Sequence, residues 1–301
     1  MDMSVEIAGV RFKNPVTVAS GTFGSGMEYC EFIDLSRLGA VTTKGVAAVP
    51  WEGNPVPRVA ETPSGMLNAI GLQNPGIDVF MDRDLPFLAG FDTNVIVNVC
   101  GHTEEEYLAV VERLYGDTRV SMLEINISCP NVREGGMSFG TDPDMVYRIT
   151  KRIKEAASQP VIMKLTPNVT DIKLTAKAAE DGGADAISLI NTLTGMKIDP
   201  EKRAFVLANK TGGLSGPAIR PVAVRMVYEA AGAVNIPVIG MGGISCASDA
   251  LEFILAGASM VSVGSANFSD PETVTKVIDG IEDYMVRHKV EKIKDLTGYL
   301  L

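Results

Sequence analysis

The fold class can be predicted from residues 161–190, VIMKLTPNVTDIKLTAKAAEDGGADAISLI. This stretch begins with an apolar run at 161–163 and continues through 172–181, where apolar residues recur with the period of a helix. It ends in a second apolar run at 186–190. A strand, a helix and a second strand in this order form the repeating unit of a parallel sheet covered by helices. The stretch therefore predicts an α/β fold.

The same alternation runs along the whole chain. Apolar runs rich in Val and Ile predict eight strands, at 16–19, 40–43, 95–97, 122–125, 161–163, 186–190, 238–239 and 260–263. Helices are predicted at 28–38, 78–89, 104–115, 143–157, 172–181, 217–231, 247–256 and 271–288. Repeated βα units of this kind predict a (β/α)8 or TIM barrel, which fits a single domain over residues 1–301.

Local signals refine this outline. Thr103, Asp142 and Asp270 each stand before a favoured first helical turn and are predicted as N-caps. Residues 5–12, with Ala8-Gly9 as the turn, predict an N-terminal hairpin that closes the amino end of the barrel. The segments 45–76 and 192–216 are long βα loops, and loops of such length in a compact domain are usually functional. We expect both to cover the active site.

Composition excludes several classes of function. The chain has 37 acidic and 27 basic residues, a formal net charge of -10, and no run of Lys and Arg. Nucleic acid is not an expected partner, because phosphate-backbone binding requires a basic surface. No signal peptide and no run of about 18 apolar residues is found, so a cytoplasmic protein without a membrane span is expected. The cysteines are too far apart for zinc or iron–sulfur ligation, and no metal site is predicted.

Polar residues and glycines follow the predicted strands. In a (β/α)8 barrel the active site is built at the carboxyl ends of the strands. The residues found there are Ser20-Gly21, Lys44-Gly45, Asn98, Asn126, Lys164, Asn191, Gly242-Gly243 and Gly264-Ser265. A buried polar group without a partner costs about 1 to 3 kcal/mol, so a purely structural barrel or a passive binding module does not need this set. The rim is therefore predicted to be an active site.

Glycine-rich turns after the last two strands suggest the ligand class. Gly240-Met241-Gly242-Gly243-Ile244 and Val263-Gly264-Ser265-Ala266 let the backbone approach a phosphate group closely. Phosphate sites of TIM barrels often follow strands seven and eight. A phosphorylated ligand is therefore expected.

Cys129, just past the fourth strand, is the candidate proton-transferring residue. A nearby cation favours the thiolate of a cysteine, and Lys44 and Lys164 are the candidate cations. Neither His102 nor His288 is expected near Cys129, which disfavours a hydrolytic Cys–His site. The remaining cysteines are expected to be inert: Cys30, Cys100 and Cys246.

Eight ordered motifs connect this sequence to a known family. They are Ala19-Ser20-Gly21-Thr22-Phe23-Gly24, Thr43-Lys44-Gly45, Asn68-Ala69-Ile70-Gly71-Leu72-Gln73-Asn74-Pro75-Gly76, Asn126-Ile127-Ser128-Cys129-Pro130-Asn131, Lys164-Leu165-Thr166-Pro167-Asn168, Ile190-Asn191-Thr192, Gly212-Gly213-Leu214-Ser215-Gly216-Pro217 and Gly240-Met241-Gly242-Gly243-Ile244. Through them the chain resembles, along essentially its whole length, the catalytic subunits of class 1B dihydroorotate dehydrogenases. Class 2 enzymes have a serine base and an N-terminal extension, unlike this sequence, and the motifs at 20–24 and 71–74 favour class 1B over class 1A.

The resemblance implies a site for FMN and a site for a pyrimidine. It implies that Gly216, Gly242, Gly243, Gly264 and Ser265 hold the FMN phosphate. The flavin ring and ribityl chain would lie near Ser20, Lys44, Gly45, Asn98, Asn126, Lys164 and Ile190. The pyrimidine would be bound by Lys44, Asn68, Ile70, Gly71, Leu72, Asn126, Asn191 and Thr192.

The implied reaction is oxidation of dihydroorotate to orotate in pyrimidine (UMP) synthesis. Cys129 would remove the C5 proton while a hydride moves from C6 to the flavin N5. Lys164 would stabilise negative charge on the reduced flavin.

The resemblance also implies a partner subunit that carries FAD and a [2Fe–2S] cluster and passes electrons to NAD+. The assembly would be a heterotetramer of two plus two chains around a homodimer core. Three alternatives stay open: a fumarate-dependent class 1A enzyme, a dihydropyrimidine dehydrogenase-like reductase, and a flavin-free barrel lyase or isomerase that uses Lys164 for a Schiff base.

Overall fold

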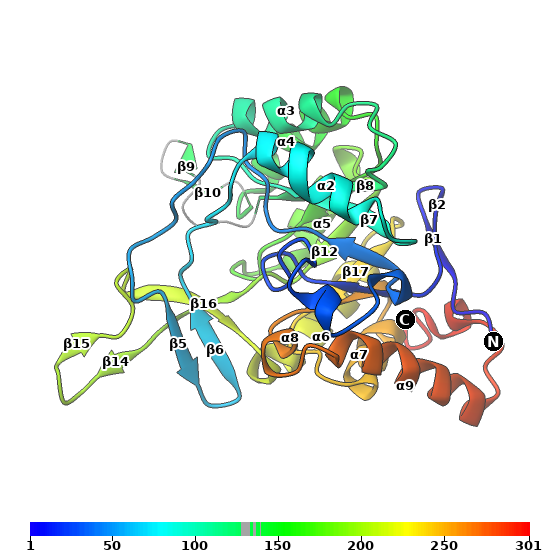
Figure 1. Cartoon of the computed structure of the whole chain (residues 1–301). Coiled ribbons are helices and arrows are strands. Elements are labelled where there is room, and N and C mark those ends of the chain that lie inside the picture. The colour runs from blue at the N-terminus through cyan, green and yellow to red at the C-terminus, as the bar shows by residue number, and fades with distance from the viewer. Residues whose placement is uncertain (128–132, 135–136, 139) are drawn as a thin grey trace.

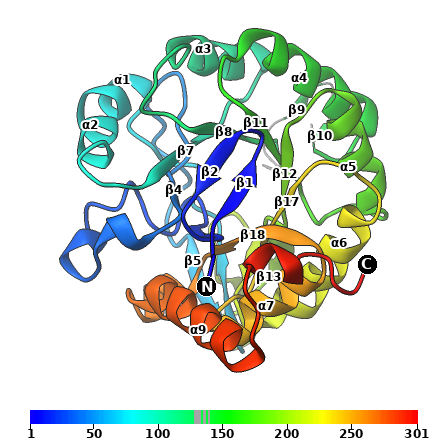
Figure 2. The same ribbon diagram turned by 90° about the vertical axis from the view of Figure 1, so that its right-hand side faces the viewer.

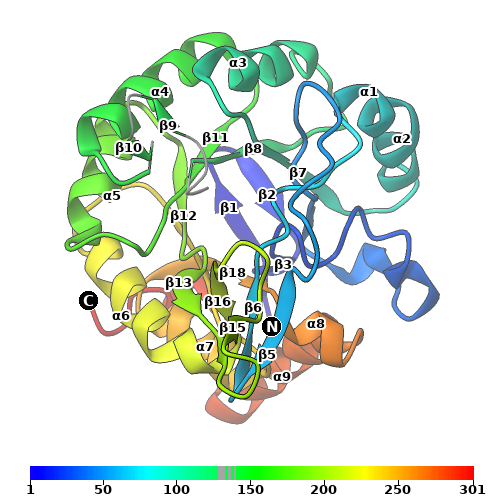
Figure 3. The ribbon, with the colours of Figure 1, turned by 90° about the vertical axis from the view of Figure 1, so that its left-hand side faces the viewer.

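A computed structural model describes residues 1–127, 133–134, 137–138 and 140–301 of the chain. Eight parallel strands form a nearly closed barrel surrounded by helices (Figures 2 and 3). In their order around the sheet the strands are β3 (Val16–Val18), β18 (Ala258–Val263), β17 (Val238–Met241), β12 (Ala186–Leu189), β11 (Val161–Lys164), β8 (Met122–Asn126), β7 (Asn94–Val99) and β4 (Ala40–Thr42). The predicted (β/α)8 barrel is confirmed, and each of its eight strands is present.

The first and last strands of this order, β3 and β4, meet at a seam. The backbone N–H of Gly39 donates to the carbonyl of Val16 at 3.0 Å. In the barrel interior the hydroxyls of Thr17 and Thr42 lie 3.0 Å apart and form a hydrogen bond. A Cβ atom at position 39 would lie only 2.1 Å from the carbonyl oxygen of Asn14, so the close approach requires glycine.

Helices cover the outside of the barrel. They are α1 (Ile77–Val79), α2 (Leu85–Leu88), α3 (Glu104–Arg113), α4 (Pro143–Ala156), α5 (Ile172–Asp181), α6 (Arg220–Ala231), α7 (Ala247–Leu255), α8 (Ala266–Ser269) and α9 (Thr273–His288). Short 3₁₀ turns are η1 (Tyr29–Glu31), η2 (Leu35–Arg37), η4 (Pro217–Ile219) and η5 (Ile293–Leu296). The π-helical turn η3 (Phe80–Asp84) joins α1 to α2. No helix in the described ranges is long and apolar enough to cross a membrane.

The helix predicted at 28–38 is wrong. This segment forms only the turns η1 and η2, because Asp34 adopts an extended backbone between them and its side chain accepts a hydrogen bond from the N–H of Ser36. Such local side-chain bonds compete with a continuing helix. The caps Thr103 and Asp142 are confirmed, since each side chain accepts a bond from the first turn of its helix. Asp270 is the C-cap of α8, and α9 begins three residues later, at Thr273; the Asp270 side chain nevertheless accepts a hydrogen bond from the N–H of Glu272, in the turn that leads into α9.

The predicted N-terminal hairpin is present at the amino end of the barrel. Strands β1 (Val5–Ile7) and β2 (Val10–Phe12) pair antiparallel, and Figure 2 shows them lying across the barrel opening. Ile7 and Phe12 are fully buried in the main hydrophobic core. The hairpin therefore closes this end with apolar side chains.

The two long loops, at the opposite end, contain strands of their own. Strands β13 (Leu193–Met196), β16 (Thr211–Ser215), β6 (Gly65–Asn68) and β5 (Val59–Thr62) form an antiparallel sheet in this order. The hairpin β14 (Ile198–Asp199) and β15 (Ala204–Phe205) projects beyond it, as Figure 1 shows. A short pair, β9 (Arg133–Glu134) and β10 (Met137–Ser138), follows β8. The sequence predicted these loops but not the strands within them, because glycines interrupt the apolar pattern that would have indicated strands.

Candidate active site

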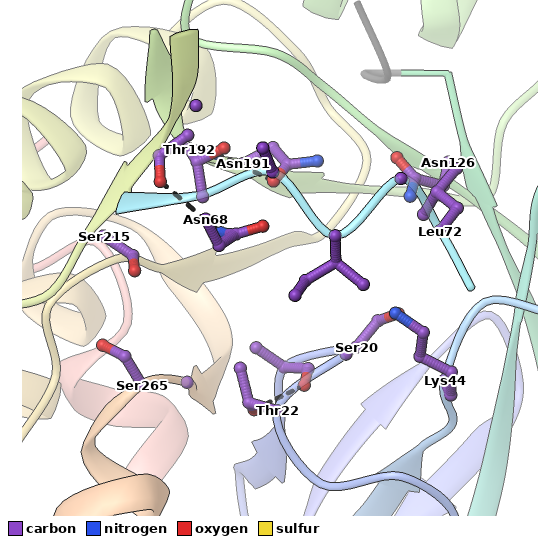
Figure 4. A pocket seen from close by; sticks show the side chains of 18 of the residues that line it. Ser20, Thr22, Lys44, Asn68, Leu72, Asn126, Asn191, Thr192, Ser215 and Ser265 are labelled. Carbon is purple, nitrogen blue, oxygen red and sulfur yellow. Dashed lines mark hydrogen bonds between the residues drawn. The ribbon is translucent and has the colours of Figure 1, made fainter. Parts of the chain in front are cut away.

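A cavity of about 960 Å³ lies at the carboxyl ends of the barrel strands and is bordered by the antiparallel sheet. It brings together most of the predicted site residues: Ser20, Lys44, Asn68, Ile70, Gly71, Leu72, Asn126, Lys164, Ile190, Asn191, Thr192, Gly216, Gly242, Gly243, Gly264 and Ser265. Figure 4 shows Lys44 and Ser20 on one side of this space and Asn68, Asn191 and Thr192 on the other. Residues from both long loops thus share one cavity with residues of the barrel strands.

Two predicted site residues, Asn98 and Gly45, do not line this cavity. Asn98 is fully buried one step deeper in the barrel, opposite Glu124 in the register of β7 and β8. A Cβ atom on Gly45 would lie 3.1 Å from Asn98 Oδ1, so these two residues pack together. Cys129 lies outside the described residues.

Two lysines reach the cavity in different electrostatic surroundings. Lys164 ends β11, is almost fully buried, and places its Nζ 3.5 Å from Oε1 of Glu124. Burial lowers the pKa of Lys44; the nearby Cys100 opposes this effect, whereas the positive charges of Lys164 and Arg58 add to it. No ion pair found in the described ranges includes Lys44. Its ammonium group is therefore suited to an anionic ligand.

Asn126 ends β8, and its side chain reaches the cavity (Figure 4). The buried Tyr107 of α3 donates its hydroxyl proton to the backbone carbonyl of Asn126 at 2.7 Å. This bond fixes the backbone at the point where the strand enters the loop that contains Cys129. The carboxamide of Asn126 can both donate and accept hydrogen bonds, as recognition of a ring amide requires.

The segment from Ile70 to Asn74 enters the cavity in an unusual backbone conformation. Gly71 has a φ of +75°, and a Cβ atom there would lie 2.6 Å from Cγ of Asn54. Leu72, with a φ of +54°, adopts the left-handed region although it is not glycine. The side chain of Asn74 stabilises the turn by accepting bonds from the N–H groups of Ala47 and Gly76. Strain of this kind persists where surrounding contacts hold the backbone in place.

Backbone forms the wall next to β17. Gly242 and Gly243 have φ values of +129° and +77°. Cβ atoms there would lie 2.8 Å from Cβ of Ala223 and 2.7 Å from the carbonyl oxygen of Gly216. No side chain fits at these positions, and the chain can approach a ligand closely.

Sequence reasoning missed several residues at this site. Trp51, Asn54, Asn168 and Ser262 also line the cavity. The ring of Trp51 packs against that of His102, with centroids 3.9 Å apart and the planes tilted by 31°. Glu124 and Ser188 lie buried below the cavity, and the alternation of side chains in a strand could have found Glu124, which stands two residues before Asn126. Trp51 and Asn54 carried no such signal, because the strands of their loop were not predicted.

The arrangement is suited to a polar, anionic ring system. Lys44 and Lys164 provide positive charge, while Asn68, Asn126 and Asn191 provide amide donors and acceptors. The part of the chain that the structure describes contains no cluster of three or more metal-ligating side chains. Amide and ammonium side chains can bind and orient a ligand but are not redox-active, so they cannot themselves accept a hydride.

Comparisons with known proteins agree with this picture. The family model for dihydroorotate dehydrogenase matches residues 2–285. A protein of Lachnoclostridium phytofermentans is 66% identical over 298 residues, which cover 99% of this chain and 99% of the relative. Relatives from Alkaliphilus metalliredigens and Thermoanaerobacter pseudethanolicus are 60% and 56% identical, and each match covers 100% of this chain and 99% of the relative. All three are named dihydroorotate dehydrogenase B (NAD(+)), catalytic subunit.

Proposed function

The chain belongs to the dihydroorotate dehydrogenase family, and we propose that it is the catalytic subunit of an NAD+-linked enzyme that oxidises dihydroorotate to orotate in pyrimidine biosynthesis. The observation that carries this proposal is the 66% identity to a catalytic subunit of that name over 99% of both chains. The convergence of lysines and asparagines in one cavity supports it independently.

The residues present fit FMN as the resident cofactor. The cavity of about 960 Å³ is large enough for a flavin nucleotide together with a small ring. Its wall at Gly242 and Gly243 is backbone without side chains, which allows the close approach that a phosphate requires. We propose that these glycines hold the phosphate together with Gly216, Gly264 and Ser265, and that Ser20, Lys44, Asn126, Lys164 and Ile190 contact the remainder. Bound FMN would supply the two-electron acceptor that these side chains lack.

The chain's own groups would bind and orient dihydroorotate. Lys44 would attract the carboxylate, because its ammonium has no ion-pair partner in the described ranges. Asn68, Asn126 and Asn191 would hydrogen-bond the carboxylate and the ring amides, which need both donors and acceptors. The strained turn at Leu72 would present an apolar surface to the ring.

Cys129 is proposed as the general base that takes the C5 proton of the substrate. A thiolate can accept a carbon-bound proton near neutral pH when positive charge is close to it. Lys164 would stabilise the negative charge that develops during the reaction.

A separate electron-transfer subunit is the proposed partner. The relatives are named as catalytic subunits of NAD(+)-linked enzymes, which supports a partner that delivers electrons to NAD+. We propose that this partner carries FAD and a [2Fe–2S] cluster and joins two catalytic chains in an assembly of two plus two.

The base assignment is tested with Cys129→Ala, mixed anaerobically with dihydroorotate while flavin absorbance is followed. We expect FMN to stay bound and its reduction near neutral pH to slow by about 10³-fold or more. The matched control is Cys30→Ala, which removes an exposed thiol far along the chain and should leave the rate unchanged. Reduction of Cys129→Ala at the wild-type rate would remove Cys129 from this role.

The activity itself is tested by anaerobic turnover of dihydroorotate with NAD+ or fumarate, with and without the co-expressed partner. We expect NAD+ reduction only when the partner is present. Turnover with fumarate by this chain alone would assign it to the fumarate-linked class. The proposal would be contradicted if the purified chain bound no flavin and did not oxidise dihydroorotate with either NAD+ or fumarate.

A further inference from the structure

Glu124 is a buried carboxylate directly below the cavity. It stands two residues before Asn126 on β8, so both side chains point to the same inner face of the barrel. Oε1 of Glu124 accepts a hydrogen bond from Nδ2 of Asn98 at 2.6 Å, and Oε2 accepts one from the hydroxyl of Ser188 at 2.8 Å. Oε1 also lies 3.5 Å from Nζ of Lys164. One carboxylate thus joins four neighbouring strands, β7, β8, β11 and β12.

Fold stability alone does not account for this group. The side chains of Glu124 and Lys164 are only 3% and 4% exposed. Removing both charges from water is costly, and well-packed apolar residues usually replace a buried ion pair at no loss of stability. Apolar side chains such as Ile96 and Ile162 are buried in the barrel close to Glu124. A charged group kept here therefore points to a role in the cavity above it.

The contrast with Lys44 indicates what that role is. Both lysines line the cavity, but only Lys164 has a carboxylate partner within 4 Å among the described residues. Glu124 therefore holds the Lys164 ammonium in one place and balances its charge. The positive charge of Lys44 has no such balance, and the charge of Lys164 acts on it.

We propose that Glu124 is a positioning residue that fixes Lys164 and Asn98 at the floor of the cavity and lowers the reduction potential of a flavin bound there through its negative charge. This inference rests on the proposed function, in that the cavity must hold FMN. A carboxylate buried next to the cavity would disfavour the anionic reduced form of a flavin bound there relative to its oxidised form. Glu124 thus keeps the potential lower than Lys164 alone would set it, which favours onward transfer of the electrons.

The test is the midpoint potential of substrate-free, FMN-loaded Glu124→Gln at pH 7. This change keeps the shape and removes the charge. We expect the ratio of reduced to oxidised FMN at a fixed applied potential to rise about tenfold, which for a two-electron couple is about 30 mV. The matched control is Glu104→Gln, since Glu104 is also buried and ion-paired, with Arg148 and Arg152, but lies between α3 and α4 on the outside of the barrel. Its potential should equal that of the wild type.

A Glu124→Gln protein that binds FMN with an unchanged potential would overturn the proposal. Wild-type protein that binds no FMN would instead overturn the proposed function, so the two failures are distinguishable.

A second measurement applies even when Glu124→Gln retains no FMN. The apoprotein is unfolded by urea as wild type, Glu124→Gln, Lys164→Met and the double variant. Each single change leaves one buried charge uncompensated, whereas the double variant removes both charges. The folding equilibrium constant of the double variant should therefore be at least tenfold larger than the value predicted by adding the two single effects on the free energy of unfolding. Additive effects would show that Glu124 does not control Lys164 and would overturn the proposal.

Discussion

The two ends of the barrel are built by the same eight strands but differ in chemistry. At the amino end the β1–β2 hairpin fills the opening with fully buried apolar side chains such as Ile7 and Phe12. At the carboxyl end the strands deliver Lys44, Asn126 and Lys164 to a cavity. The amino end therefore contributes to stability, whereas the carboxyl end accepts buried polar groups at a cost in stability. Substitutions at the two ends should therefore separate stability from cofactor chemistry.

The largest effect is expected at the amino end, from Phe12→Ala. Removal of this fully buried ring should lower the free energy of unfolding by about 4 kcal/mol, as lost apolar burial and a cavity together usually cost. Urea unfolding measures this loss, and Phe32→Ala, which truncates a phenylalanine that is 58% exposed, is the control. FMN affinity of the folded fraction should stay at the wild-type value. A large drop in that affinity would break the comparison, because it would couple the hairpin to the site.

The sequence predicted the amino end and the barrel well, because both depend on short apolar runs with a clear period. It predicted the rim residues Lys44 and Lys164 for the same reason, since each directly follows a predicted strand. It missed Trp51 and Asn54, whose place depends on pairing within the loop 45–76, where Trp51 forms a bridge with Asn74 and the N–H of Asn54 donates to the carbonyl of Ile70. It also missed the break at Asp34, where a side-chain bond overrides helix propensity.

The second effect is expected at the carboxyl end, from Lys164→Met. Loss of a buried positive charge next to the proposed flavin site should slow flavin reduction by dihydroorotate about 100-fold and weaken FMN retention. Rapid mixing and dialysis of the holoprotein measure the two quantities. Lys151→Met, on the exposed face of α4, controls for a general change in net charge. Wild-type values for both quantities would exclude Lys164 from the site.

Lys44→Met should raise the free energy of unfolding, whereas Phe12→Ala should lower it. Burial lowers the pKa of Lys44 in the folded protein, so the folded state binds its proton less readily than the unfolded state. The cost of the charge is fully present below the folded pKa and is relieved as pH rises towards the unfolded value. We therefore expect Lys44→Met to stabilise the apoprotein at pH 7 by about 1 kcal/mol, because it removes a charge that burial disfavours.

This gain should shrink in urea unfolding repeated at pH 10, where the wild type has lost part of the cost. The exposed Lys173→Met serves as control. If Lys44→Met were less stable than the wild type at pH 7, Lys44 would contribute to the stability of the fold. The two ends of the barrel would then differ less in their contribution to stability than proposed.

The smallest effect is expected between the two ends, at the seam of the barrel. Thr17→Val removes one partner of the buried hydroxyl pair and leaves the hydroxyl of Thr42 without its bond, which should cost about 1 kcal/mol in urea unfolding. The double variant Thr17→Val/Thr42→Val removes both polar groups and should recover most of this loss, because two apolar groups of similar shape leave nothing unpaired. If the double variant were destabilised as much as Thr17→Val or more, the hydrogen bond itself would stabilise the seam. Its role would then go beyond supplying each buried hydroxyl with a partner. In that case polar contacts deeper in the barrel than Glu124 would also help to stabilise the fold. Stability would then not depend on apolar packing alone in that part of the barrel.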